Sequence, residues 1–418
     1  MRRFTLRRLA PPSLRVVGGL TFALAALLGA SCRPDTQPLA PTDASLDRAG
    51  TPMNPATLAA GREIFRHDTF GDETYWTDTL RMHEVIASAV SPAAALAAGL
   101  KVDLDALPPA LVEALTKGEV DLASPATTVA LLELGAVVGL KGTVDASHTL
   151  TRVGVTCALC HSTVDDAFAP GIGRRLDGWP NRDLNVGAIV ALSPAVPAAT
   201  KTILNGWGPG MYDPRINIDG QNTPLVLPPA FGLRHVARET YTGDGPVSYW
   251  NAYVAITQMH GHGTFVDPRI GVSISNPPDL VSSKLEALRA YQLSIETPTS
   301  TIAAGSRAAV QRGKQVFMGT ARCASCHRGS TYTDVNAGVL HPAAEVGQDP
   351  AYALRTATRR YRTTPLRGLW RPPQLTGPYF HDGSAATLED VVEHYVTHFK
   401  LTLTAQQKAD LVTFLKTL

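Results

Sequence analysis

The chain has 418 residues, of which 44% are hydrophobic and 18% charged, and its formal net charge is +2. Five arginines and no carboxylates fall within residues 1–31, so without that segment the net charge becomes −3. This balance excludes the basic surface that nucleic-acid-binding proteins use, and we expect no nucleic-acid partner. The length allows two or more domains, each with its own core.

Residues 1–31 are predicted to be an export signal. A basic stretch ends at Arg15, residues 16–30 are apolar, and small residues precede Cys32. The apolar run is too short, and wrongly flanked, for a spanning helix. The ending resembles the cleavage site of bacterial lipoproteins, which predicts a lipid anchor on Cys32. Ordinary cleavage nearby, leaving Cys32 as a spare thiol, stays open. We expect an exported, periplasmic protein anchored to a bacterial membrane.

Two copies of a short pattern organise the rest of the chain. Gly61 and Phe65 share the spacing Gly-x-x-x-Phe with Gly313 and Phe317, each on an amphipathic helical pattern. We therefore expect a tether over 32–54, a first domain over 55–300 and a second over 301–418, divided near a Ser/Thr/Pro-rich stretch. The first domain carries an insertion at about 66–150, which is predicted to be mostly helical because Ala and Leu dominate it.

Each predicted domain contains one C-x-x-C-H motif, formed by Cys157, Cys160 and His161 in the first and by Cys323, Cys326 and His327 in the second. The two thiols of such a motif reach the two vinyl groups of one porphyrin, and the adjacent histidine lies beneath the iron. The motifs use four of the five cysteines. They predict two covalent c-type haems, while redox dithiols, zinc sites or structural disulfides are the alternatives.

The residues from Gly313 to the C-terminus resemble the bacterial di-haem cytochrome c peroxidases and their MauG relatives. The resemblance rests on Gly-x-x-x-Phe, the second C-x-x-C-H motif, Arg362-Thr363-Thr364-Pro365-Leu366-Arg367 and a stretch ending in His381-Asp382-Gly383. It implies an all-α fold of two cytochrome-c-like haem domains, the first with the large insertion. Over 55–300 the match weakens to the haem motif and an Asn-Thr-Pro segment.

The resemblance also implies ligands. In that family the sixth ligand of the C-terminal haem lies fourteen residues beyond the His-Asp-Gly histidine, and here that residue is Tyr395. No methionine follows Cys326, which excludes a methionine ligand from this half. Neighbouring His394 or His398 could ligate instead, or Tyr395 could be a core residue. The resemblance further implies a calcium ion, with ligands from Asn222, Thr376 and Pro378, although an asparagine before Thr-Pro also suits a turn.

The N-terminal domain departs from the peroxidases. Their inter-haem tryptophan is absent, and Tyr241, Tyr249 or Trp250 could replace it as an electron relay. Where the distal glutamate is expected, the chain has a segment containing His260 and His262. A neutral imidazole there could take and return the protons of hydrogen peroxide. Equally, His260 or Met259 could ligate the iron, or the segment could be a solvated turn.

The resemblance implies a peroxidase-like oxidoreductase. Electrons from a redox partner protein or a small donor would pass between the C-terminal haem and an N-terminal haem that meets peroxide or another oxidant. Two alternatives stay open. One is an electron-transfer cytochrome without turnover, and the other is a di-haem dioxygenase of the rubber-oxygenase type, whose substrate channel the insertion could shape.

Overall fold

The computed structural model describes residues 53–300, 306–370 and 377–418. The predicted export signal, Cys32, most of the predicted tether and Thr376 lie outside these ranges. No helix within the described ranges is both long and apolar enough to span a membrane.

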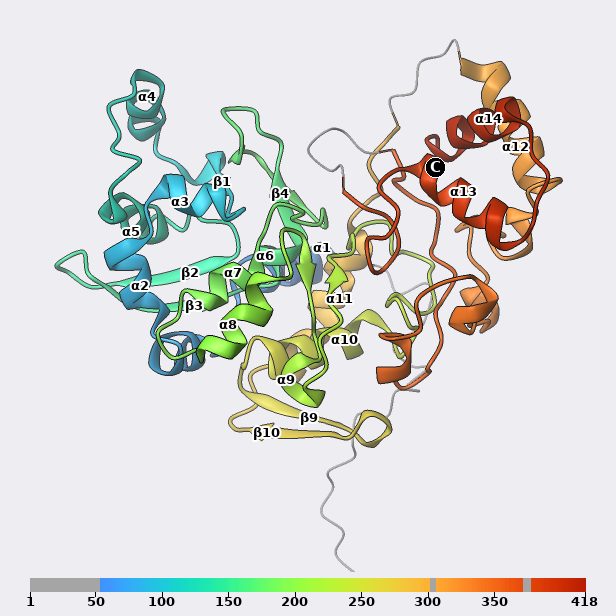
Figure 1. The fold of residues 1–418 in the computed structure, drawn as a ribbon. Coiled ribbons are helices and arrows are strands. Elements are labelled where there is room, and N and C mark those ends of the chain that lie inside the picture. The colour runs from blue at the N-terminus through green and yellow to red at the C-terminus, as the bar shows by residue number, and fades with distance from the viewer. Residues whose placement is uncertain (1–52, 301–305, 371–376) are drawn as a thin grey trace, which may run out of the picture. The chain divides into compact units, whose positions relative to one another are not determined.

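Two helix pairs carry the repeated Gly-x-x-x-Phe pattern. Helix α1 (Pro55–His67) packs on α11 (Leu285–Ser294), and α12 (Arg307–Met318) packs on α14 (Ala405–Leu415) (Figure 1). A Cβ atom on Gly61 would lie 2.0 Å from the Ala287 carbonyl oxygen, and one on Gly313 would lie 2.0 Å from the Asp410 carbonyl oxygen. Each crossing therefore requires a glycine, because the two backbones touch there.

The phenylalanine of each repeat fills the core beside its crossing. Phe65 contacts Tyr291 with ring centroids 5.6 Å apart, and Phe317 contacts Phe414 at 5.3 Å. Both phenylalanines are buried. The two halves thus share one local construction, in which a glycine admits the partner helix and an aromatic ring closes the space one turn later.

The segment predicted as an insertion is mostly helical but also contains strands. Its elements are π-helix η1 (Thr74–Thr79), α2 (Met82–Ala89), α3 (Pro92–Ala97), 3₁₀-helix η2 (Leu104–Ala106), α4 (Pro109–Lys117), α5 (Pro125–Glu133), β1 (Val102–Asp103) and β2 (Leu140–Val144). The antiparallel partner of β2 is β3 (Leu150–Val155), and Leu140 pairs with Val155. Leu80, Met82, Ile86 and Leu132 from this segment join one core with Phe65.

The remaining elements of the first part are short. The helices are α6 (Ala158–His161), α7 (Val186–Ala191), α8 (Ala198–Asn205), α9 (Ile216–Asp219), α10 (Val247–Tyr253), π-helix η3 (Val254–Gln258), and 3₁₀-helices η4 (Pro268–Ile270) and η5 (Ser282–Lys284). The strands are β4 (Ser162–Val164), β5 (Ile172–Gly173), β6 (Arg175–Asp177), β7 (Met211–Tyr212), β8 (Leu225–Val226), β9 (Gly263–Asp267) and β10 (Val272–Asn276).

After α12, the C-terminal part contains one long α-helix besides α14, namely α13 (Leu388–His398). Its 3₁₀-helices are η7 (Cys323–Ser325), η8 (Val335–Ala337), η9 (Ala343–Glu345) and η10 (Ala353–Arg355). Thr387 caps α13 and Thr404 caps α14, each with a capping box that satisfies backbone donors at the helix start.

The prediction of an all-α fold needs correction, because the described residues also form five two-stranded sheets. The longest pairings join β2 with β3 and β9 with β10, the latter placing Val272 opposite Asp267. Alternating and β-branched residues favour these strands, as in residues 150–155. The chain is therefore mostly helical with small sheets.

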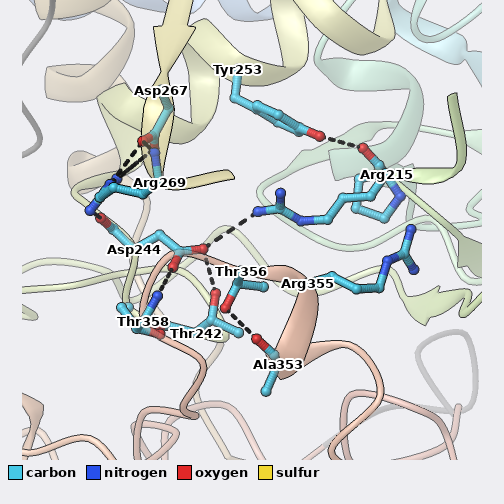
Figure 2. A network of polar contacts seen from close by, with 12 residues as sticks. Arg215, Thr242, Asp244, Tyr253, Asp267, Arg269, Ala353, Arg355, Thr356 and Thr358 are labelled. Atoms are coloured by element: carbon cyan, nitrogen blue, oxygen red, sulfur yellow. Dashed lines mark hydrogen bonds and ion pairs between the residues drawn. The ribbon is translucent and has the colours of Figure 1, made fainter. Parts of the chain in front are cut away.

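A buried polar network joins residues before 300 to residues after 350 (Figure 2). Arg355 donates from Nη1 to Asp213 at 2.9 Å and from Nε to Asp219 at 2.8 Å. Asp244 accepts from the Thr358 backbone at 3.1 Å and lies 3.7 Å from Arg215 Nη2. Arg215, Arg355 and these aspartates are mostly buried, so each charge depends on its partner for compensation.

Candidate functional site

The second C-x-x-C-H motif opens into a cavity of about 430 Å³. Its walls are largely apolar side chains from α12, α13 and α14, and Cys323, Cys326 and His327 are among the residues that line it. The apolar residues of these three helices are Phe317, Leu388, Val391, Val392, Val396, Leu411 and Leu415. Such a space suits a large, flat, apolar ligand.

The hydrogen bond of His327 fixes which ring nitrogen is available. Its Nδ1 lies 3.0 Å from the Tyr332 carbonyl oxygen. A carbonyl only accepts, so Nδ1 carries the proton and the lone pair of the neutral ring lies on Nε2. Burial lowers the pKa of His327, which favours that neutral ring. His327 is thus prepared to bind a metal through Nε2.

The two cysteines of this motif are free thiols. Burial raises the pKa of Cys323 to about 11 and also raises that of Cys326. The absence of a bond between them argues against a structural disulfide and leaves both sulfurs available for covalent attachment.

Tyr395 reaches the same cavity from α13. Its ring lies between those of Phe380, at 5.8 Å, and Phe399, at 5.9 Å. Burial raises the pKa of the Tyr395 phenol, and its hydroxyl makes no hydrogen bond with another described residue. Tyr395 is half-buried, so its hydroxyl is available to a ligand in the cavity.

His394 and His398 engage a different segment. His394 Nε2 lies 3.3 Å from the Val346 carbonyl oxygen, and His398 Nε2 lies 3.0 Å from that of Glu345. Neither histidine is among the described residues that line the cavity. The phase of α13 therefore turns Tyr395 into the cavity and the two histidines toward η9.

His381 also lines the cavity, but its ring is held by Tyr361. The two residues are linked from His381 Nε2 to the Tyr361 hydroxyl at 2.9 Å. That hydroxyl donates to the Asp349 carbonyl at 2.8 Å, so it accepts from the imidazole. His381 thus acts as a hydrogen-bond donor that supports the wall of the cavity.

The first motif repeats the histidine arrangement of the second. His161, at the end of α6, has its Nδ1 3.2 Å from the Pro228 carbonyl oxygen. Burial lowers its pKa to about 4, so the ring is neutral, and Nε2 makes no hydrogen bond with another described residue. Cys157 and Cys160 are free thiols, each with a pKa that burial raises to about 12.

The residues expected to bind calcium have other partners. Asn222 Oδ1 accepts from the Trp207 indole at 2.7 Å, and the Pro378 carbonyl accepts from Arg182 Nη1 at 3.2 Å. A guanidinium at one of the expected ligand oxygens opposes a cation there. Thr376 lies outside the described residues. The described residues therefore give calcium no support, and that ion stays a prediction.

The structure separates the two candidate distal histidines. His262 Nδ1 lies 3.2 Å from the Pro277 carbonyl oxygen, and the His262 backbone amide donates to Phe70 at 2.8 Å. His260 instead stacks on Tyr75, with ring centroids 3.7 Å apart and planes inclined by 19°. Burial lowers the pKa of His260, and its φ of 64° lies in the left-handed region. A strained backbone at such a position is common at functional sites.

Comparison with known proteins shows similarity to c-type cytochromes. The cytochrome c family model matches residues 310–418. The chain is 29% identical over 160 residues to the methylamine utilization protein MauG of Methylorubrum extorquens, covering 33% of this chain and 43% of that protein. It is 28% identical over 183 residues to the cytochrome-c peroxidase IdrP1 of Denitromonas iodatirespirans, covering 32% of this chain and 48% of that protein. Residues 310–418 thus match a cytochrome c domain, and part of the chain is similar to MauG and to a cytochrome-c peroxidase.

The cytochrome c match supports a haem c cofactor, and the similar proteins are consistent with an oxidoreductase. The chain spans about half the length of the curated relatives it matches. Two solved structures also show likeness. A hydrazine synthase of Kuenenia stuttgartiensis has a TM-score of 0.34 at 21% identity, covering 51% of this chain and 78% of that one. A MauG-like protein associated with microbial copper homeostasis has a TM-score of 0.23 at 25% identity, covering 32% and 56%. TM-scores this low do not indicate a shared arrangement.

The residues of both C-x-x-C-H motifs fit haem c. Each combines two free thiols with a neutral imidazole whose Nδ1 is bonded to a backbone carbonyl, as haem-ligating and other metal-ligating histidines require. Cys326 also has potential ligand atoms of Asp334 and His341 within 4.8 Å, a grouping that could hold a metal ion. A thioether bond would remove that sulfur from metal binding, so the cluster and a covalent haem exclude each other.

Several residues near the first motif were not anticipated from the sequence. Tyr75 and Trp76 come from π-helix η1, and the Trp76 indole donates to the Met259 carbonyl at 3.2 Å. Tyr212 is half-buried and donates to Gln258 Oε1 at 2.7 Å. The adjacent aromatic pair in a segment otherwise rich in Ala and Leu was the one signal that could have identified Tyr75 and Trp76.

A buried carboxyl also lies near the first C-x-x-C-H motif. Asp72, just before η1, accepts from the Val155 backbone amide at 3.2 Å. Burial raises the pKa of Asp72 to about 9, and the nearby Glu73 and Asp68 raise it further. The group is therefore a neutral acid at neutral pH, and it lies close enough to Cys157 to influence the pKa of that thiol.

Proposed function

We propose that the chain is a periplasmic di-haem c-type cytochrome that acts as a peroxidase-like oxidoreductase. The main support is that in both C-x-x-C-H motifs the histidine has its Nδ1 on a backbone carbonyl, beside two free thiols, and that neither Nε2 makes a hydrogen bond of normal distance and geometry to another residue of the described ranges. The likeness to MauG and to a cytochrome-c peroxidase supports the reaction class. Hydrogen peroxide is the proposed oxidant, and the proposed reductant is a redox protein or a small donor.

The two sites have different proposed roles. At the C-terminal site, the Tyr395 hydroxyl is the proposed sixth ligand, supported by its place in the cavity and by its lack of a hydrogen bond with another described residue. A bound haem would supply one-electron transfer there. An anionic phenolate favours the oxidised state, so this site suits the storage of oxidising equivalents.

At the N-terminal site, His260 is the proposed proton carrier. Its pKa is lowered by burial, so the ring is neutral and can accept a proton from an oxidant and then return it. His262 lies apart from this stacked pair, with its Nδ1 on the Pro277 carbonyl. We expect His260→Ala to slow peroxide consumption about 100-fold or more. His262→Ala is the matched control, and equal loss in both variants would remove His260 from this role.

An electron-transfer cytochrome without turnover is the second candidate. It is favoured by the stacking of Tyr75 on one face of His260 and by the bond between Tyr212 and Gln258, which together fill space near the first motif. The described insertion gives no comparable support to a dioxygenase, since Leu80, Met82 and Ile86 are packed into the main core.

Haem content tests the proposal directly. Pyridine haemochrome analysis of the exported protein should give two covalent haems per chain. The variants Cys157→Ala/Cys160→Ala and Cys323→Ala/Cys326→Ala should each retain one. A wild-type content of one haem would limit the proposal to a mono-haem cytochrome, and a content of zero would overturn it. Export and lipidation are tested by labelling with palmitate, which Cys32→Ala should abolish.

A further inference from the structure

The charged side chains that line the C-terminal cavity in the described part of the chain are all positive. Among the described residues that line it are four arginines and no aspartate or glutamate. The arginines are Arg182, Arg322, Arg362 and Arg367. A cavity with apolar walls and only cationic charged side chains favours an anionic ligand, because cations in a low-dielectric space need compensation.

Arg362 differs from the other arginines in its hydrogen bonds. Arg182 donates to the Pro378 carbonyl, and Arg367 Nη1 is shared by the carbonyls of Gly232 and Arg234 at 2.9 and 3.0 Å. Arg322 lies on the exposed surface. Arg362 is bonded through Nε and Nη2, while its Nη1 is buried and has no hydrogen-bond partner among the described residues.

The two bonds of Arg362 hold its guanidinium in one orientation. Nε donates to the Thr240 carbonyl at 2.6 Å and Nη2 to the Glu239 carbonyl at 3.0 Å. These acceptors are neutral, so they do not neutralise the charge. The nearby Glu239 carboxylate accepts from the Val247 amide at 3.0 Å and lies 4.0 Å from Arg289. Burial lowers the pKa of Arg362 to about 10, and the charge of Glu239 only partly opposes that shift.

We propose that Arg362 Nη1 donates to a propionate of the haem attached at Cys323 and Cys326. This inference rests on the proposed function only in requiring a haem in the cavity. A haem brings carboxylates into a space whose described charged side chains are arginines, and a guanidinium is the side chain best suited to bind a carboxylate.

The bond would also tie the haem to the first part of the chain. The backbone amide of Arg362 donates to the Tyr241 carbonyl at 3.0 Å, so residue 362 holds residues 239–241 at three points. The next residues, Thr242 and Asp244, belong to the network in Figure 2, where Thr242 donates to Asp244 at 2.7 Å. Arg362 is therefore a positioning residue that connects the C-terminal haem to the segment leading into α10.

The test compares Arg362→Gln with Arg360→Gln, each prepared as holoprotein. Arg360 is exposed, lies two residues away and donates to the Leu340 carbonyl, so its variant removes the same charge outside the cavity. We expect R362Q to shift the propionate bending band in the resonance Raman spectrum. We also expect it to lower the midpoint potential of the C-terminal haem by at least about 59 mV. For one electron this corresponds to a tenfold change in the ratio of oxidised to reduced haem. R360Q should change neither.

The sign follows from charge. Oxidised haem carries one more positive charge than reduced haem, so removing a nearby cation favours oxidation and lowers the potential. Arg362→Lys keeps the charge but loses the planar fork, and it should shift the Raman band with a smaller change in potential. If the R362Q protein does not accumulate, the position of the propionate bending band in R362K alone tests the proposal.

The measurements distinguish a failure of the proposed function from a failure of the proposed role of Arg362. If the second motif carries no haem, the proposed function fails. If the haem is present but R362Q, or R362K in its place, leaves the propionate band at its wild-type position, only the role of Arg362 is overturned.

Discussion

At the scale of single residues, Tyr395 is the proposed sixth ligand that would set the redox potential of the C-terminal haem. Its ring lines the cavity that contains His327 and both cysteines, and its hydroxyl lacks a hydrogen bond among the described residues. His394, its neighbour in sequence, contacts the Val346 carbonyl instead. The assignment therefore follows from which side of α13 each residue occupies.

Replacing Tyr395 tests this assignment. In Tyr395→Phe the anionic ligand is lost, so the ferric state is less favoured and the midpoint potential should rise by at least about 60 mV, a tenfold change. Spectroelectrochemistry of the holoprotein measures this shift. His394→Ala is the matched control and should leave the potential unchanged. A shift in H394A without one in Y395F would assign the ligand to His394.

Asp72 predicts a pH dependence of stability. Its folded pKa is raised from 3.8 to about 9. Below pH about 4 the carboxyl is protonated in both folded and unfolded chains. As the pH rises toward 9, only the unfolded chain ionises, so the free energy of unfolding falls by at most about 1.4 kcal/mol per pH unit.

Asp72→Asn removes this ionisation while keeping an acceptor for the Val155 amide. In urea unfolding, the advantage of D72N over wild type should therefore grow steadily between pH 5 and pH 9. Glu113→Gln, at an exposed carboxylate on α4, is the control. An advantage that is constant with pH would show that Asp72 ionises normally in the folded protein.

At the scale of elements, the glycine crossings hold the helix pairs together. A Cβ on Gly313 would lie 2.0 Å from the Asp410 carbonyl oxygen, so α12 and α14 would have to separate. We expect Gly313→Ala to lower the free energy of unfolding by about 1–3 kcal/mol, the usual cost of overpacking. Gln311→Ala, on the exposed side of α12, should change it by less than about 0.5 kcal/mol. Equal effects would mean that the crossing tolerates a side chain.

The elements also show how far the sequence could predict the structure. The Gly-x-x-x-Phe spacing predicted α1 and α12, because contact between close-packed helices imposes glycine and an aromatic residue at fixed positions. Within the insertion predicted to be mostly helical, α5 ends at Glu133 and strand β2 follows. Short strands depend on pairing with distant partners, which a local pattern does not reveal. Tyr75 and Asp72 were missed for the same reason, since their contacts with His260 and Val155 span long stretches of sequence.

At the scale of the whole molecule, Arg355 links distant segments of the chain. It bonds to Asp213, Asp219, Thr223 and the Gln221 carbonyl. Arg355→Met should leave the fully buried Asp213 uncompensated and lower the free energy of unfolding by about 3–5 kcal/mol. Adding Asp213→Asn should recover part of that loss. Urea unfolding measures both, and no recovery in the double variant would contradict a charge-based role.

We propose that the two haem sites differ: Tyr395 would occupy the sixth coordination position of the C-terminal iron, whereas that position of the N-terminal iron would be free to bind an oxidant. Electron paramagnetic resonance of the ferric holoprotein, recorded with and without cyanide, tests it most directly. We predict one low-spin signal that cyanide leaves unchanged and one high-spin signal that cyanide converts to low spin. Two low-spin signals that both ignore cyanide and peroxide would contradict it and identify an electron carrier.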